Sequence, residues 1–417
     1  DYSQYADRVD YEDLKERLLP EIQKLKREYQ EQSMNSPFIS NIVKGHYLSL
    51  KKKSFSSNDT NLYAKYIHNI IHLIKWKRAV YKNKIVNKLT IIGQAVQPTF
   101  ALFRILGNDH WPRHSETQSI DNLKKILDEE HKFEDCAKIF VVNRIIDGLR
   151  EAELINCLKE NNVKYYSIPF KLNDYASCEY DYAAFGGREF FTSDNFKKLS
   201  TPRQIAAAIF VCRRKIAYAM HVNGARNASI KWGNEIADWT FPWDGSCALN
   251  QASFKAIQES CRKMPKLPLR IVPMARMLSN DTDIEEFEPS ATTEEPQILI
   301  SRNCTDCFDE NWPYGFRDKT EFLQRAGVPG PWHYWPRYPW LPSHNASDNI
   351  DGQFDYVNGY AIRLASGQNR LDETVKNTPR FRARNAAILS TIKSLEVSLS
   401  REVPEFLELA DRPDYIE

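Results

Sequence analysis

Hydrophobic and polar residues follow two different periods along the central part of the chain. TFALFRIL (99–106) has the apolar, β-rich composition of a short buried strand, and AKIFVVNRI (137–145) and VKYYSIPF (163–170) repeat it. Helical periodicity separates these runs, over 119–131 and 151–161. A succession of strand, helix, strand, helix and strand is typical of parallel βαβ units, so the sequence predicts an α/β fold with a mostly parallel, Rossmann-like sheet and flanking helices.

The pattern continues towards the C-terminus with longer interruptions. Residues 172–200 and the acidic run 281–296 lack a clear period and are predicted to be loops. Further regular elements are predicted as strands at 237–243, 269–275 and 297–301 and as helices at 201–222, 225–236 and 372–401. An open α/β sheet binds its ligands at the carboxyl ends of its strands, so those ends are where we look for chemistry.

The N-terminal part of the chain has a different pattern of apolar and charged residues. Residues 10–34 and 62–90 combine helical periodicity with interleaved charges, and they predict an N-terminal helical region over 1–95. Lysines and arginines are in excess in LKKKSF and IKWKRAVYKNK. Such an excess fits peripheral contact with a membrane or an acidic partner, and it equally fits a solvated helix face, which is the commoner case.

Composition excludes several classes of protein. Lys and Arg number 57 and Asp and Glu 55 in 417 residues, and the resulting formal charge of +2 provides no general field for nucleic acid. No stretch has the roughly 20 apolar residues that span a bilayer, and no signal peptide is recognised. The chain begins at Asp1 without a Met, so a lumenal or membrane-associated location after loss of an upstream segment stays open.

The absence of known sequence motifs disfavours further classes of protein. The chain has no P-loop, GxGxxG, HExxH or GxSxG motif, which disfavours P-loop NTPases, dinucleotide enzymes, zincins and α/β-hydrolases. Eight cysteines are scattered, mostly in apolar surroundings that favour reduced thiols. Cys304 and Cys307 form a single CxxC, for which plain thiols are the first interpretation and a disulfide or a metal site the alternatives.

Asp244 is the most informative position. The apolar strand ADWTFPW (237–243) brings this carboxylate to a sheet edge, with the flexible Gly245 beside it. Hard cations such as Mg²⁺ or Mn²⁺ prefer oxygen ligands, and they often share them with a phosphate. A strand-ending Asp that stabilises a turn is the competing interpretation.

The order of elements around Asp244 resembles the nucleotide-sugar glycosyltransferases of the GT-A fold, especially the large inverting family 2. The matching pieces are a helix starting Ala225-Arg226-Asn227, the buried strand, and Asp244-Gly245-Ser246 in place of a DxD turn. The resemblance covers roughly residues 100–340. It implies a nucleotide-diphosphate sugar donor, Mn²⁺ or Mg²⁺ at Asp244, and a glycan, lipid or protein acceptor. Ser246 replaces the second Asp, so the second metal ligand would be water-mediated or a distant residue such as His333.

The resemblance implies that the loops after the first two strands hold the donor. In RILGNDHWPRH, the candidates are Arg104, Asn108, Asp109 and Arg113, because a turn backbone and an Arg can together grip a diphosphate. Turn formation or an ion pair is the alternative for each of them.

Two further pairs of residues are candidate donor contacts. In VVNRIIDG, Asn143 and Asp147 are placed to hydrogen-bond the base. Arg226 and Asn227 open the predicted helix at 225–236, and a helix N-terminus favours phosphate. Simple turn or capping roles compete in both cases.

Two C-terminal segments supply the acceptor side. In GFRDKTEFLQRAG, Asp318 and Glu321 share one helix face, and either could be the base that accepts a proton from the acceptor hydroxyl. A solvated acidic helix start is the alternative. The segment PGPWHYWPRYPW is rich in aromatic residues that could stack on sugar faces instead of filling a core, and its candidate contacts are Trp332, His333, Tyr334 and Trp335.

The sequence thus predicts an N-terminal helical region (1–95), a nucleotide-sugar-binding GT-A-like core (96–276) and an acceptor-side and C-terminal helical region (277–417). The expected function is metal-assisted, inverting glycosyl transfer. One alternative is a non-catalytic carbohydrate-binding or scaffold protein, for which Ser246 is the main support. Another is a sugar nucleotidyltransferase, although GNDHWPRH is a poor match to the Gly-rich basic loop that such enzymes carry.

Overall fold

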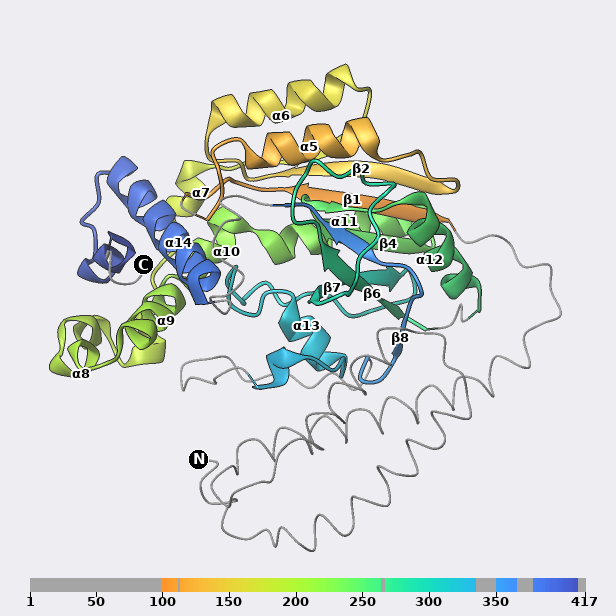
Figure 1. The fold of residues 1–417 in the computed structure, drawn as a ribbon. Coiled ribbons are helices and arrows are strands. Elements are labelled where there is room, and N and C mark those ends of the chain that lie inside the picture. Colours follow the sequence, from red (N-terminus) through yellow and green to blue (C-terminus); the bar gives the residue numbers. More distant parts are fainter. Residues whose placement is uncertain (1–98, 112, 264–266, 335–349, 366–377, 412–417) are drawn as a thin grey trace, which may run out of the picture. The chain divides into compact units, whose positions relative to one another are not determined.

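The computed structural model describes residues 99–111, 113–263, 267–334, 350–365 and 378–411 (Figure 1). All of these residues belong to one compact unit. The helices predicted at 10–34 and 62–90 lie outside the described residues, and so does the membrane contact suggested for them. Within the described part of the chain, no helix has the length and apolar character needed to cross a membrane.

A mixed sheet of nine strands forms the centre of the described structure, in the order β3-β2-β1-β4-β7-β6-β9-β5, with β8 paired to β6. The α/β class predicted from the sequence is confirmed. The sheet is less parallel than predicted, because β7 runs antiparallel to both β4 and β6, and β5 is antiparallel to β9. The strands are β1 (Phe100–Leu106), β2 (Cys136–Asn143), β3 (Lys164–Ile168), β4 (Trp239–Asp244), β5 (Cys247–Ala248), β6 (Leu269–Arg276), β7 (Glu294–Ser301), β8 (Phe354–Tyr356) and β9 (Ala361–Arg363).

The predicted βαβ units are present. β1, β2 and β3 are parallel neighbours, connected through α5 (Gln118–Glu129) and α6 (Gly148–Glu160). Side chains alternate between the two faces of β1. Leu106 packs with α5 and α6, whereas Ala101, Phe103 and Ile105 pack with α11 (Val222–Ile236). Figure 1 shows α5 and α6 together on one side of β1 and β2.

Several helices differ from the prediction. The segment 172–200 contains short helices, and the helix predicted at 201–222 is divided at Cys212. His221 adopts a left-handed conformation (φ 47°) that ends α10, so α11 begins at Val222. These and the remaining helices are α7 (Leu172–Ala176), η1 (Tyr182–Phe185), η2 (Arg188–Thr192), α8 (Asp194–Lys197), α9 (Thr201–Val211), α10 (Arg213–Met220), α12 (Gln251–Lys263), α13 (Thr320–Arg325), η3 (Pro331–Tyr334), α14 (Thr378–Ser398) and η4 (Glu405–Asp411).

A second hydrophobic core lies between helices and not on the sheet. α9, α10, α14 and η4 contribute apolar side chains to it, including Ile216 and Ile392. Lys215 and Glu396 form an ion pair at 3.0 Å inside this region, and Tyr175 donates a hydrogen bond to Glu396 at 2.7 Å. This packing fixes α14, which matters because α14 also reaches the candidate site.

Candidate functional site

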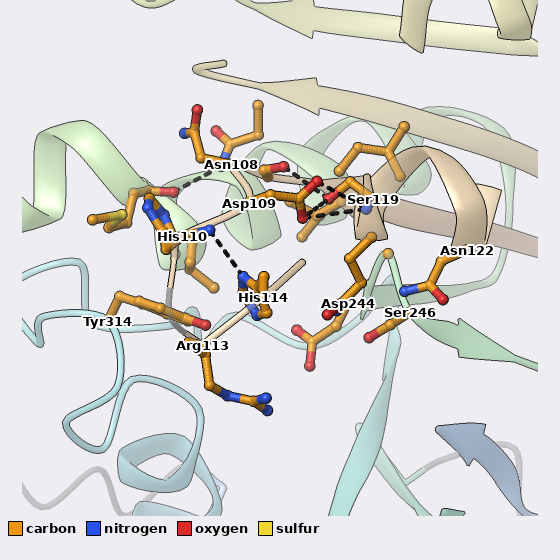
Figure 2. Close-up of a pocket in the computed structure, with 18 of the residues that line it drawn as sticks. Asn108, Asp109, His110, Arg113, His114, Ser119, Asn122, Asp244, Ser246 and Tyr314 are labelled. Carbon is orange, nitrogen blue, oxygen red and sulfur yellow. Dashed lines mark hydrogen bonds between the residues drawn. The ribbon is translucent and has the colours of Figure 1, made fainter. Parts of the chain in front are cut away.

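A polar cavity of about 260 Å³ lies at the carboxyl ends of β1 and β4. Residues 107–110, 113 and 114 of the loop after β1 line one side, and Asp244 and Ser246 at the end of β4 line another (Figure 2). β1 pairs with β2 on one side and with β4 on the other, so the strands that follow β1 in the chain are added to both sides of it. This position is a topological switch point, where open α/β sheets bind their ligands.

The strand pleat decides where the Asp244 side chain points. Asp244 pairs in register with Ile105, which faces α11, whereas the neighbouring Trp243 is buried with the core on the other face. Because successive side chains alternate, Asp244 points towards the α11 side and into the cavity. Its side chain is 25% exposed.

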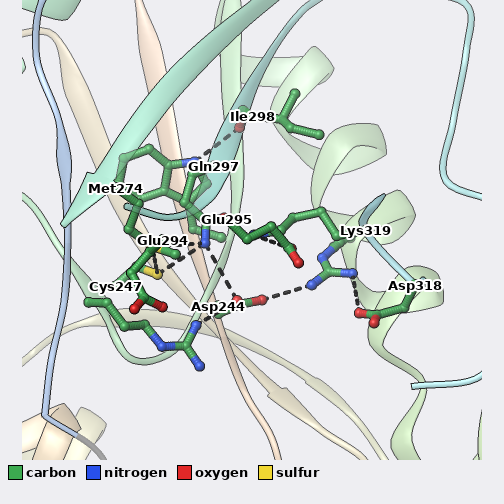
Figure 3. A network of polar contacts seen from close by, with 12 residues as sticks. Asp244, Cys247, Met274, Glu294, Glu295, Gln297, Ile298, Asp318 and Lys319 are labelled. Atoms are coloured by element: carbon green, nitrogen blue, oxygen red, sulfur yellow. Dashed lines mark hydrogen bonds and ion pairs between the residues drawn. The ribbon is translucent and has the colours of Figure 1, made fainter. Parts of the chain in front are cut away.

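Two arginines bind the Asp244 carboxylate (Figure 3). Arg226 on α11 donates to Oδ1 at 2.8 Å, and Arg363 at the end of β9 donates to Oδ2 at 2.9 Å. Arg226 also pairs with Asp318 at 3.0 Å, so it bridges two carboxylates. Burial would raise the pKa of Asp244, but the charges of Arg226, Lys319 and Arg363 outweigh burial and hold that pKa well below its usual range. Asp244 is therefore ionised and paired.

This pairing bears on the metal expected at Asp244. Each carboxylate oxygen already accepts a charged hydrogen bond, and Ser246 supplies no second carboxylate in the turn. Among the described residues, no group of three or more His, Cys, Asp or Glu side chains is arranged to hold a metal. A divalent cation prefers several oxygen ligands that are free to coordinate, so the arrangement does not fit Mn²⁺ or Mg²⁺. His333, the suggested second ligand, does not line the cavity, and its ring lies 2.9 Å from the carbonyl of Val328.

Gly245 lets two strands approach closely. Its amide donates to the carbonyl of Ile105 at 2.9 Å, and a Cβ built at this position would lie 2.7 Å from the same oxygen. That separation is shorter than any ordinary contact of a side-chain carbon, so glycine is required here. The Gly in the predicted turn has this steric role, and it holds Asp244 against β1.

The polar residues at the start of the loop after β1 hold its conformation. Asn108 donates to the carbonyl of Arg144 and accepts from the amide of Ile146, which ties the loop to the one after β2. Asp109 accepts from the amide and hydroxyl of Ser119 in the first turn of α5. Burial raises the pKa of Asp109, although these hydrogen bonds oppose the rise. Both residues line the cavity, but their polar atoms are already engaged with protein.

Arg113 is different, because it has no hydrogen-bond or ion-pair partner among the described residues. It lines the same cavity. Burial lowers the pKa of its guanidinium to about 10. Tyr314 raises this pKa, whereas the charges of Arg363, Arg384 and Arg276 lower it further. In all, six Lys and Arg side chains and five carboxylates line the cavity. The net charge of the lining is therefore +1 with the histidines neutral, and the arginines near Arg113 provide a local positive charge that can attract an anion.

Two neutral histidines line the cavity beside Arg113. The Thr391 hydroxyl donates to the carbonyl of Ala387 at 2.8 Å, so it must accept from Nδ1 of His110 at 2.9 Å. His110 thus carries its proton on Nδ1, and Nε2 keeps a lone pair with no partner among the described residues. Burial lowers the pKa of His110 to about 4. His114 accepts the His110 amide through Nδ1, which leaves Nε2 as a donor.

Arg104, which was expected to grip the donor, lies outside the cavity. Its guanidinium is fully buried, forms an ion pair with Glu130 and donates to the carbonyl of Cys247 at 2.7 Å. It occupies the face of β1 opposite Phe103 and Ile105, which face α11. The prediction was wrong because Arg104 lies within the strand and not in the loop that follows it.

Two of the predicted donor contacts, Asp147 and Asn227, have structural roles away from the cavity. Asp147 caps α6 by accepting the amides of Leu149 and Arg150, so capping prevails over base recognition. Asn227 bonds the backbone of Phe308, and it lies inside α11 because that helix starts at Val222.

Glu321 is 3% exposed and forms an ion pair with Arg325 at 2.9 Å. Burial raises its pKa, but it does not line the cavity and cannot serve as the base there. Asp318, its companion in the prediction, does line the cavity. Asp318 shares its charge with Arg226 and accepts the amide of Gly315 at 3.2 Å.

Of the remaining predicted contacts, Asn143 lies at the cavity, whereas Trp332 of the aromatic segment does not. Asn143 lines the cavity and donates to the carbonyl of Met220 at 2.8 Å, and its buried Oδ1 has no partner within the ranges that the structure describes. Trp332 is 3% exposed and donates to the carbonyl of Val328, so it fills a core and forms no acceptor wall. The side chain of Tyr334 and all of Trp335 lie outside the described residues.

Sequence reasoning missed several residues of the site. Arg363 ends the three-residue strand β9, and Glu295 on β7 pairs with Lys319 at 2.9 Å. His110 and Tyr314 were not selected as site residues, although His110 stands inside the quoted loop sequence. The presence of Arg in a short apolar strand next to a Gly- and Tyr-rich turn was the one available indication for Arg363, and it is weak.

Comparison with known proteins adds no family or relative. No model of a known protein family matches this chain, and a search of curated proteins finds no significant match.

Proposed function

We propose that this protein is a glycosyltransferase that takes a sugar from a nucleotide-diphosphate donor and transfers it to a hydroxyl of a glycan, lipid or protein. One observation carries the proposal: Asp244 and the turn after β4 share a cavity rich in charged side chains with the loop after β1, at the switch point of an α/β sheet. The parallel order β3-β2-β1-β4 is compatible with the GT-A-like core inferred from the sequence.

The cavity offers chemistry suited to each part of such a donor. Arg113 and its cationic neighbours favour the diphosphate. The free Oδ1 of Asn143 can accept a hydrogen bond from a ribose or base. Few neutral small molecules would require so many charged groups in one cavity, which supports an anionic ligand.

Glycosyl transfer also needs a proton acceptor. The bond from the anomeric carbon to the diphosphate oxygen breaks, the acceptor oxygen binds that carbon, and the acceptor proton must leave. Asp318 and His110 both line the cavity, and either side chain can take this proton. Nε2 of His110 is the stronger candidate, because its lone pair is unengaged among the described residues and burial keeps the imidazole neutral.

A thermal-shift screen with UDP, GDP, ADP, CDP and dTDP in the presence of Mn²⁺ tests donor binding. A nucleotide that binds the folded protein raises its melting temperature by linkage. Release of that nucleotide diphosphate from its sugar donors, with and without added glycan acceptors, then tests transfer. No shift with any nucleotide and no release from any donor would refute the proposal.

A non-catalytic carbohydrate-binding protein remains the second candidate. It is favoured by the pairing of both Asp244 oxygens with arginines and by Ser246 in place of a second acid. That protein would show thermal shifts with sugars but no release of a nucleotide from any donor. The two measurements above therefore separate the candidates.

A further inference from the structure

We infer that the cavity binds the diphosphate through arginine side chains without a divalent cation, and that Asp244 acts as a positioning residue for those arginines. The inference rests on the proposed function for the identity of the anion. It departs from the metal that the sequence resemblance implied, and it assigns direct phosphate contact to Arg113 and Arg363.

Arg113 is the first support for this assignment. It follows β1 on the loop that lines the cavity, and no carboxylate among the described residues neutralises it. Burial lowers the pKa of Arg113, and repulsion from Arg363, Arg384 and Arg276 lowers it further. Holding an uncompensated cation near like charges costs free energy, and a bound polyanion would offset that cost.

Arg363 is the second support. One of its terminal nitrogens donates to Asp244, whereas its buried Nε has no hydrogen-bond partner in the described part of the chain. Guanidinium groups bind phosphate by paired, parallel N–H donors, so an Arg held at one end by a carboxylate can present the remaining donors to a ligand. The ion pair thus orients Arg363 and does not consume it.

The state of Asp244 is the third support. A metal ligand must offer a lone pair to the cation, but here Arg226 and Arg363 occupy one oxygen each. Inserting Mn²⁺ between Asp244 and these arginines would break two charged hydrogen bonds and place a dication beside two cations. Arginine charge performs the neutralisation that a metal would otherwise supply.

Calorimetric titration of the full chain tests the inference, with the nucleotide diphosphate that gives the largest thermal shift used as the probe. Titrations are run in EDTA and in excess Mn²⁺. We expect dissociation constants that agree within about twofold, since no metal contributes to binding. Arg113→Ala and Arg363→Gln should each weaken binding about tenfold or more, because each removes charged hydrogen bonds to phosphate. Arg262→Ala, an equal change of charge on the exposed end of α12, should leave binding unchanged.

Asp244→Asn separates a positioning role from a metal-ligand role. If Asp244 orients the arginines, this variant weakens binding by the same factor in EDTA and in Mn²⁺. If Asp244 binds a metal, the variant removes the gain due to Mn²⁺ and leaves binding in EDTA unchanged. A tenfold or greater dependence of wild-type binding on Mn²⁺ would overturn the inference but leave the proposed function standing, whereas absence of binding in both buffers would refute the proposed function itself.

Discussion

Replacing Asp244 by Asn should destabilise the folded protein as well as alter ligand binding. The carboxylate accepts charged hydrogen bonds from Arg226 and Arg363, and removing one partner of a fully buried ion pair costs about 3–5 kcal/mol. The side chain is 25% exposed to the cavity, so solvent reduces that figure. Arg226 keeps Asp318, but Arg363 keeps no carboxylate partner among the described residues. We therefore expect a loss of about 2–3 kcal/mol in the free energy of unfolding.

Urea unfolding of the wild type and of D244N measures this loss as a lower midpoint with an unchanged slope. Adding Arg363→Gln completes a double-mutant cycle, and we expect a coupling energy of about 1–2 kcal/mol between the two positions. Additive effects, or a cost below about 0.5 kcal/mol for D244N, would refute the assignment of a strong ion pair.

The pH dependence of this difference provides a further check. The pKa of Asp244 lies below its ordinary value of 3.8 in the folded protein, so below about that pH the unfolded chain binds more protons than the folded one. The stabilising contribution of Asp244 is thus complete above pH 3.8 and is lost as the pH falls below it. The difference between wild type and D244N should shrink in the same range.

Two further outcomes are expected from the residues around Asp244. Burial lowers the pKa of His110 from 6.5 to about 4, so as the pH falls through 6.5 the unfolded chain binds a proton that the folded protein does not, and up to about 3 kcal/mol of stability is lost by pH 4. Between these pH values the urea midpoint should fall more steeply with pH in the wild type than in His110→Asn. An equal pH dependence of the two midpoints would contradict this. Gly245→Ala should cost about 1–3 kcal/mol and weaken nucleotide binding, because the new Cβ would meet the Ile105 carbonyl at 2.7 Å. Gly107→Ala, with open space around its Cβ, is the matched control, and a similar cost in both variants would exclude the steric explanation.

The local hydrophobic patterns correctly predicted the half of the sheet in which neighbouring strands follow one another in sequence. β1, β2 and β3 and their helices appear close to their predicted bounds, because each is long enough to have its own period. Strands β5, β8 and β9 have two or three residues and no detectable period. Their existence depends on pairing with β6 and with each other, which a local pattern does not specify. The antiparallel direction of β7 has the same origin.

Arg104 and Arg113 show why residue type alone does not identify a site residue. Both lie in the quoted loop segment, and both were assigned the same role. Arg104 lies inside β1, where alternation directs it to the buried face and Glu130, whereas Arg113 follows the strand and has no carboxylate partner in the part of the chain that the structure describes. The alternation of side chains along the strand up to Leu106 would have assigned Arg104 to a strand face and Arg113 to the following loop. The same argument explains Asp244, whose position at the end of its strand predicted the direction of its side chain.

Long-range topology brings the remaining charges to the cavity. Arg363 lies 119 residues beyond Asp244 in sequence and reaches it because β9 pairs with both β5 and β6. Lys319 and Glu295 join the cavity through β7, which lies between β4 and β6. The cavity therefore draws on residues before and after 276, so the region assigned to the acceptor also supplies positive charge to this cavity. Because these cations come from separate elements, the charge that binds an anion depends on the complete mixed sheet, and no single loop motif in the sequence could have revealed it.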